Sequence, residues 1–253
     1  DPEADSEESR DFLPRFAAAL TAFIDRKGIR NSCRFHVSDE PPLEQYEVYK
    51  KRADLIAEIF PGFKVIDALS DIEFFDKGAV KYPIPSEDHV EDFVGKVDEF
   101  WTYYCCGQHN KNVPNRFFAM PSARNRILGT LLYKYNATGF LQWGYNYWYS
   151  QFSKHEIDPF TVTDAGKAFP SGDAFVVYPG EDGQPINSLR FKVFYDGLQD
   201  LAAMRLLESL VGREKAFEIA IQDDELTFQK YPHGSSYLLA LRERVNKAIK
   251  ENI

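Results

Sequence analysis

The chain is poor in the residues that build disulfides and metal sites. Its 253 residues include 3 Cys, 5 His and 2 Met, and the cysteines and histidines show no C-x-x-C or H-E-x-x-H spacing. The sequence therefore predicts neither a disulfide framework nor a metal, and we expect no cofactor. So few thiols are typical of a reducing compartment. No secretory signal sequence opens the chain, and we expect a cytoplasmic location.

A surplus of positive charge and long apolar runs are also missing. Lys and Arg number 30 against 39 Asp and Glu, a net charge of -9, which argues against a nucleic-acid partner. No apolar run approaches the ~20 residues that a membrane span needs, so we expect no membrane partner. Aromatic residues, in contrast, are abundant: 21 Phe, 14 Tyr and 3 Trp. Rings serve as platforms for sugar faces, although a single ring more often packs in a core.

Residues 35–42 join a strand-like run to two neighbouring carboxylates and two prolines. Because side chains alternate along a strand, His36 and Glu40 fall on one polar row, and Asp39 faces the other way unless the strand has already ended. The prolines stiffen the chain that follows. We predict that Asp39 and Glu40 lie at the carboxyl end of a parallel strand, where barrel enzymes carry catalytic groups. The alternative is a polar strand end and a helix cap.

The hydrophobic pattern alternates between helical and extended periods, which is typical of a parallel α/β fold. We predict helices over 12–27, 43–60, 122–135, 189–210, 213–222 and 236–250, strands over 33–38, 64–69, 99–106 and 139–148, a short strand over 175–178 within the loop 150–188, and a strand or extended loop over 82–85.

These elements are too few for a complete eight-stranded barrel, which takes ~250 residues. We interpret residues 1–149 as the second half of a (β/α)8 TIM-type barrel. Residues 150–253 would add a long loop, a short β segment and a C-terminal helical tail packed on the barrel. An N-terminal fragment that completes the barrel is then an expected partner.

Several segments, in this order, resemble the glycoside hydrolase family 123 type of catalytic domain, which is also classified as domain of unknown function 4091. They are residues 35–41, 101–106, 115–117, 121–126 and 139–148, and the resemblance covers about residues 30–210. It implies a (β/α)8 barrel, normally preceded by a β-sandwich domain that this chain lacks. It also implies a retaining hydrolase, similar to β-N-acetylgalactosaminidases, that uses the 2-acetamido group of its own substrate.

In that family the paired Asp-Glu is catalytic, which the resemblance carries onto Asp39 and Glu40. We assign Glu40 as the general acid/base and Asp39 as the partner of the substrate amide. Further sugar ligands are expected on the polar row and at other strand ends, each with ordinary core packing or barrel-interior hydrogen bonding as the alternative. These substrate-binding candidates are His36, Asp67, Trp101, Tyr103, Tyr104, Trp143, Tyr145 and Asn146.

The expected function is removal of a terminal β-linked N-acetylhexosamine, with N-acetylgalactosamine as the favoured sugar and a carbohydrate as the partner. Two alternatives stay open. One is a barrel glycosidase on a sugar without acetamido participation, and the other is a non-catalytic, carbohydrate-binding half-barrel.

Overall fold

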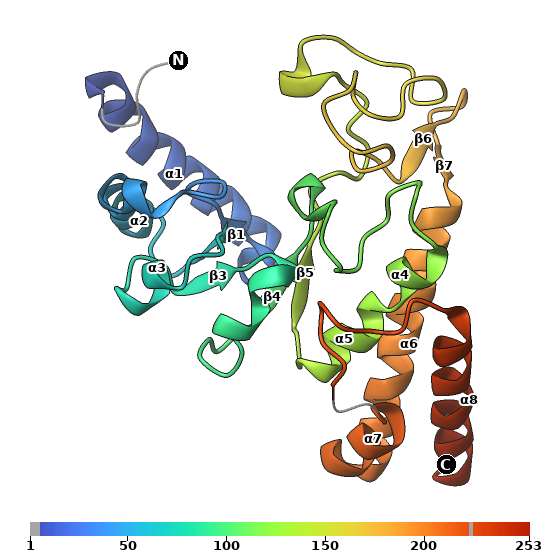
Figure 1. Cartoon of the computed structure of the whole chain (residues 1–253). Helices are drawn as coiled ribbons and strands as arrows, with labels where there is room; N and C mark the ends of the chain where they lie inside the picture. Colours follow the sequence, from blue (N-terminus) through green and yellow to red (C-terminus); the bar gives the residue numbers. More distant parts are fainter. Residues whose placement is uncertain (1–5, 223–224) are drawn as a thin grey trace. The chain divides into compact units, whose positions relative to one another are not determined.

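The computed structural model describes residues 6–222 and 225–253. The chain forms two compact units, Asp1–Trp101 and Thr102–Ile253. Figure 1 shows the elements of both, coloured along the sequence. Helices and short strands occur in each unit, so the expected mixed α/β class is confirmed.

The first unit contains a three-stranded parallel sheet in the order β1-β2-β3. Residues 34 and 35 of β1 lie beside residues 64 and 65 of β2, and residues 66–68 of β2 lie beside residues 82–84 of β3. The elements are α1 (Glu7–Lys27), η1 (Arg30–Ser32), β1 (Arg34–Phe35), η2 (Leu43–Gln45), α2 (Tyr46–Ile59), β2 (Lys64–Ala68), α3 (Glu73–Asp76), β3 (Tyr82–Ile84) and η3 (Glu87–Asp92).

Local signals account for the ends of α1. The Ser6 side chain accepts a hydrogen bond from the Ser9 backbone N–H at the start, and Gly28 adopts a left-handed conformation at the end (φ 67°). Ser and Gly are the preferred residues at these two positions, for hydrogen bonding and for the absence of a Cβ respectively. The predicted end of this helix, at residue 27, is confirmed.

The core of the first unit lies between α2 and the chain that follows β2. Tyr49 and Ala53 of α2 are buried together with Leu69, Phe74 and Val80. The Tyr49 ring meets Phe74 edge to face, with 5.1 Å between the ring centres. This packing fixes the position of α2 over β2 and brings the Tyr49 hydroxyl to a carboxylate on that strand.

The second unit is mainly helical. Its central helix α6 packs against α4, α5, α7 and α8, and Figure 1 shows these helices gathered around it. The elements are η4 (Cys106–Gln108), α4 (Ser122–Arg126), α5 (Leu128–Lys134), β5 (Gly139–Leu141), η5 (Gln151–Ser153), an antiparallel pair of β6 (Val177–Pro179) with β7 (Pro185–Asn187), α6 (Leu189–Val211), α7 (Arg213–Ala220) and α8 (Ser235–Glu251). β4 (Trp101–Tyr103) begins at the last residue of the first unit and pairs with β5.

A buried carboxylate and two glycines hold this helical layer together. Asp200 of α6 is fully buried and accepts hydrogen bonds from Arg126 of α4 and Arg242 of α8, both within 3.0 Å. Gly129 of α5 lies against Gly197 of α6 so closely that a Cβ on Gly129 would stand 1.8 Å from the Gly197 carbonyl oxygen. The two helices therefore meet through their backbones.

The predicted strands are shorter in the structure, for an identifiable reason. The strand expected over 33–38 ends at Phe35. The backbone N–H groups of Val37 and Ser38 donate to the side-chain carboxylate of Asp67 on β2 and not to a backbone carbonyl of that strand. The strand expected over 139–148 ends at Leu141, and the chain beyond it lies against residues 174–177.

Other boundaries differ less. β4 covers three residues of the expected 99–106, residues 82–84 do form a strand, and the helix expected over 122–135 divides at Ile127 into α4 and α5. The strand expected over 175–178 begins two residues later, at Val177, as the first arm of a hairpin. The half-barrel and a domain division after residue 149 stay predictions.

Candidate active site

The loop after β1 presents the two acidic side chains. Asp39 and Glu40 are both exposed, so the loop has left the alternating register that would have turned them to opposite faces. Glu40 has a left-handed backbone (φ 45°), and its N–H donates to the Ala68 carbonyl at 2.9 Å. Residues other than glycine rarely adopt this conformation, and such strain is concentrated at functional sites. The loop is thus pinned to the carboxyl end of β2.

A buried carboxylate on β2 binds backbone and side-chain groups at the start of the same loop. Asp67 is fully buried. One oxygen accepts the backbone N–H groups of Val37 and Ser38 at 2.7 and 3.0 Å and lies 2.5 Å from Nδ1 of His36. The other oxygen accepts the Tyr49 hydroxyl at 2.6 Å. Asp67 therefore holds the start of the loop in place, and both of its carboxylate oxygens accept hydrogen bonds from groups of the protein.

His36 is the cationic member of this site. Its hydrogen bond with Asp67 raises its pKa to about 9, against the opposing effect of burial, with smaller contributions from the Ile66 carbonyl and the Asp39 charge. The imidazole is therefore an imidazolium at neutral pH. Nδ1 faces Asp67 and the Ile66 carbonyl, while 51% of the side chain is exposed. Nε2 is thus the ring nitrogen left for an external oxygen.

Burial separates the predicted sugar-binding rings into two groups. Tyr103 and Tyr104 are buried, and Tyr104 packs edge to face on Phe140. Trp143 and Tyr145 are exposed, as is Asn146, whereas Trp101, in the first unit, is partly buried. The structure therefore groups Trp143, Tyr145 and Asn146 on one surface segment of the second unit. It groups His36, Asp39, Glu40 and Asp67 in the first unit.

The surface segment 143–147 is held by the chain around residue 173. The Val176 N–H donates to the Tyr145 carbonyl, and the Tyr147 N–H donates to the Ala174 carbonyl. The buried Arg116 guanidinium donates to the carbonyl oxygens of both Gly144 and Asp173, at 2.7 and 2.9 Å. These contacts fix the backbone that carries the exposed rings.

Sequence reasoning missed two buried polar side chains, Tyr49 and Asp173. Asp173 is fully buried, and neither of its carboxylate oxygens has a hydrogen-bond partner of ordinary geometry among the described residues. Burial raises its pKa to about 6, opposed by Arg116, Trp143 and Arg190. Asp173 stands in a Pro-Ser-Gly-Asp turn sequence and Tyr49 on the apolar face of a helix, and neither setting distinguishes a functional residue from a structural one.

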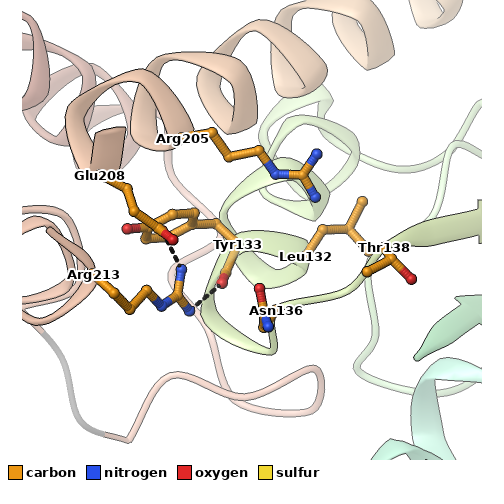
Figure 2. Close-up of a pocket in the computed structure, with 7 residues that line it drawn as sticks. All are labelled: Leu132, Tyr133, Asn136, Thr138, Arg205, Glu208 and Arg213. Carbon is orange, nitrogen blue, oxygen red and sulfur yellow. Dashed lines mark hydrogen bonds and ion pairs between the residues drawn. The ribbon is translucent and has the colours of Figure 1, made fainter. Parts of the chain in front are cut away.

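A pocket of about 300 Å³ between α5, α6 and α7 contains none of the predicted site residues. Figure 2 shows the Arg213 guanidinium between Glu208 and the Tyr133 carbonyl, with donor–acceptor distances of 2.9 and 2.8 Å. Arg205 donates to the Ala137 carbonyl at 2.9 Å. Arg213 satisfies carbonyl groups at the end of α5, as basic side chains often do at helix C-termini, and Arg205 satisfies one in the chain just beyond it. The two arginines that line this pocket therefore have a structural explanation.

Residues 6–222 and 225–253 contain no group of three or more His, Cys, Asp or Glu side chains arranged to hold a metal ion. No helix within these ranges has both the length and the apolar character of a membrane span.

Exposed paired carboxylates at the end of a parallel strand are the kind of site that carbohydrate-hydrolysing α/β enzymes carry. The sequence model of the glycoside hydrolase 123 catalytic domain matches residues 1–207. The chain therefore belongs to the glycoside hydrolase 123 catalytic domain family. No curated protein matches the chain.

A solved structure supports the fold. It is a family 123 glycoside hydrolase from Clostridium perfringens, studied for the details of glycolipid glycan hydrolysis, with a TM-score of 0.64 and 16% sequence identity. The match covers 99% of this chain and 45% of that one, so this chain spans less than half the length of that protein. At this identity the similarity concerns the fold alone.

Proposed function

We propose that the chain carries the catalytic carboxylates of a retaining, substrate-assisted glycosidase that removes a terminal β-linked N-acetylhexosamine, with N-acetylgalactosamine as the favoured sugar. The observation that carries this proposal is the pair of adjacent exposed carboxylates, Asp39 and Glu40, pinned to the end of β2 by the Glu40–Ala68 hydrogen bond. Membership of the glycoside hydrolase 123 catalytic domain family supports it.

Glu40 acts as the general acid and then the general base. Its protonated carboxyl donates a proton to the glycosidic oxygen as the bond to the anomeric carbon breaks. The acetamido oxygen of the substrate attacks that carbon and forms a cyclic oxazolinium, while the Asp39 carboxylate accepts a hydrogen bond from the amide N–H. Glu40 then deprotonates a water molecule that opens the ring, and the sugar leaves with its β configuration retained.

The adjacency of the two acids favours this route over direct double displacement. A retaining pair that works by a covalent intermediate holds its carboxyl groups ~5 Å apart on opposite sides of the sugar. Neighbouring residues such as Asp39 and Glu40 start from one point of one loop, and they reach a sugar from the same side more naturally. The nucleophile is then supplied by the substrate.

Other side chains are proposed to bind the sugar. The His36 imidazolium is placed to donate from Nε2 to a sugar oxygen, while Nδ1 keeps its contact with Asp67. In the second unit we propose Trp143 and Tyr145 as ring platforms and Asn146 as a hydroxyl ligand, because these predicted residues are exposed. Trp101, Tyr103 and Tyr104 stay proposed substrate-binding residues, each within its own unit, and Asp67 would act through His36.

The architecture proposed for the site is half of a (β/α)8 barrel that an N-terminal fragment completes. The parallel order β1-β2-β3, with α2 between β1 and β2, supports this proposal. It predicts that activity depends on the segment that supplies the other strands, and that mixing the two pieces restores hydrolysis if the 253-residue chain is inactive alone.

The test is hydrolysis of an aryl N-acetyl-β-galactosaminide by the wild-type protein and by Glu40→Gln, Asp39→Asn and Glu44→Gln variants. We expect turnover to fall at least about a hundredfold for the first two. The exposed Glu44 lies outside the proposed chemistry, and its substitution should leave turnover unchanged. Near wild-type turnover in both Glu40→Gln and Asp39→Asn would contradict the assignment of these two residues as catalytic.

An inhibitor decides whether the acetamido group participates. A thiazoline analogue of the cyclised intermediate should inhibit strongly if the mechanism is substrate-assisted. Hydrolysis that resists this compound would favour a glycosidase without acetamido participation. A folded protein that binds N-acetylgalactosamine but hydrolyses nothing, with or without the completing fragment, would favour the non-catalytic alternative.

A further inference from the structure

A second pocket in the Thr102–Ile253 unit has a charge opposite to that of the whole chain. Its volume is about 360 Å³, and Lys154, His155 and Lys167 line it together with Phe152 and no acidic residue. The protein as a whole has a net charge of -9. The cationic side chains give this pocket a local positive potential, which attracts an anion.

The cationic groups of this pocket are available to a ligand. Among the residues that the structure describes, neither Lys154 nor Lys167 forms an ion pair with a carboxylate. The Lys154 ammonium lies 5.7 Å from the centre of the Phe152 ring, which is 77% exposed. One carboxylate oxygen of Asp164, a nearby acidic residue, accepts the backbone N–H groups of Gly166 and Lys167 at 3.1 and 3.0 Å.

Backbone strain is concentrated around the same pocket. Six residues other than glycine have positive φ angles in the described chain, and four of them are Phe152, Ser153, Ala165 and Lys167, with values between 53° and 71°. Each such conformation costs about 1 kcal/mol or more and persists only where the surroundings enforce it. Strain of this kind at a lined pocket is typical of ligand-binding loops.

Ring contacts and hydrogen bonds connect the pocket to the proposed sugar platform within this unit. The Trp143 ring lies 5.2 Å from Phe169, the neighbour of the pocket residue Ala168. Trp143 also lies 5.5 Å from Tyr147, whose hydroxyl is hydrogen-bonded to the side chain and the backbone N–H of Ser153, at 3.1 and 2.9 Å. A saccharide stacked on Trp143 would therefore have its next unit within reach of the pocket.

We propose that this pocket is a subsite for a negatively charged sugar, bearing a carboxylate or a sulfate ester, that is linked to the N-acetylhexosamine. Lys154 and Lys167 would neutralise the anion, and the exposed Phe152 ring would contact the apolar face of the sugar. The placement of the first sugar on Trp143 rests on the proposed function.

Matched disaccharides provide the test. N-acetylgalactosamine β-linked to glucuronic acid and the same sugar β-linked to glucose differ only in a carboxylate against a hydroxymethyl group, and a sulfated glucose derivative replaces the carboxylate by a sulfate. For the Lys154→Gln/Lys167→Gln double variant we expect KM for the two anionic substrates to rise roughly three- to tenfold, as the loss of two exposed charge contacts implies. KM for the glucose disaccharide should not change. A rise with only one anion identifies which group the pocket takes.

Salt and a control variant make the result specific. The KM for the anionic disaccharides should increase with sodium chloride in the wild type, because exposed charges are screened within about a Debye length. Lys192→Gln, at an exposed position on α6 outside the pocket, should behave as the wild type. If the double variant changes KM for charged and neutral disaccharides equally, or not at all, the subsite is absent.

Failure of the proposed function is distinguishable from failure of this inference. If the protein hydrolyses none of the disaccharides, their binding is measured directly by titration calorimetry. Tighter binding of an anionic disaccharide than of the neutral one, lost in the double variant, then supports the subsite without catalysis. Equal affinities in the wild type would overturn it.

Discussion

Nδ1 of His36 lies 2.5 Å from a carboxylate oxygen of Asp67, which joins the loop after β1 to the interior of β2. The histidine is half exposed and the aspartate is fully buried, so the pair connects the surface where Asp39 and Glu40 lie with the core. Because Asp67 also accepts the Tyr49 hydroxyl, a helix, a strand and the acidic loop share one carboxylate.

The two nitrogens of His36 can be tested separately. An asparagine places its amide nitrogen near the position of Nδ1, and a glutamine places it near Nε2. His36→Asn should therefore keep an inward, uncharged hydrogen bond to Asp67 and lose the outward donor, raising KM with a smaller loss of thermal stability than His36→Gln. His36→Gln should reverse this pattern. Steady-state kinetics and thermal denaturation of both variants check it, and identical behaviour of the two would contradict separate roles.

The stability of the protein should fall at alkaline pH. The pKa of His36 is raised to about 9 from an ordinary value of 6.5. A raised pKa in the folded state means that the stabilisation is complete below about pH 6.5 and is lost as pH rises through about 9. Since the side chain is half exposed, screening reduces the effect to about 1–2 kcal/mol. Denaturant unfolding between pH 6 and pH 10 should show this loss in the wild type and not in His36→Asn.

Removing the Tyr49 hydroxyl should lower the free energy of unfolding more than removing the hydroxyl of nearby Tyr46. Tyr49→Phe leaves a buried oxygen of Asp67 without its 2.6 Å donor, which costs about 1–3 kcal/mol. Tyr46→Phe removes a hydrogen bond to the Lys77 carbonyl at an exposed site and should cost less. Chemical denaturation measures both. A larger loss for Tyr46→Phe would show that Asp67 does not depend on Tyr49.

Asp173 should destabilise the protein at neutral pH. Burial raises its pKa from 3.8 to about 6, so its contribution to stability is present below about pH 3.8 and is lost as pH rises through about 6. At pH 8 the buried carboxylate is ionised, and Asp173→Asn should increase the free energy of unfolding by up to roughly 3 kcal/mol. The gain should vanish near pH 4, and Asp92→Asn, at an exposed position, should show none.

A stabilised Asp173→Asn variant also reports on function. If its stability increases while its KM rises, the buried carboxylate is retained for the Trp143 region and not for the fold, since functional groups often reduce stability. An unchanged KM would make Asp173 a residue that affects stability only.

The contact between α5 and α6 should not tolerate a side chain at Gly129. Gly129→Ala places a methyl group 1.8 Å from the Gly197 carbonyl oxygen, and the helices must separate. The loss should be about 3 kcal/mol or more, beyond ordinary overpacking. Gly107→Ala, whose Cβ would meet only the Cys105 sulfur at 3.5 Å, is the control. Equal melting temperatures for the two variants in thermal denaturation would contradict the close contact between α5 and α6.

Local signals predicted much of the framework. The strand expected over 64–69 is β2, Gly28 ends α1, and the helices expected over 43–60 and 236–250 are present within a few residues. Such elements are read from periodicity and caps, which depend on neighbours in the sequence. The family, too, was predicted from short segments in order and is confirmed by the match over residues 1–207.

The sequence by itself determined the α/β class, the family and the adjacency of Asp39 to Glu40. Tertiary structure decided that the first strand ends at Phe35, that Trp143 is exposed while Tyr104 is buried, and that Tyr49 reaches Asp67. The reason is that a strand ends where its backbone donors find other acceptors, and a ring is buried where distant segments pack on it. Both depend on partners that are remote in the sequence and that no local pattern specifies.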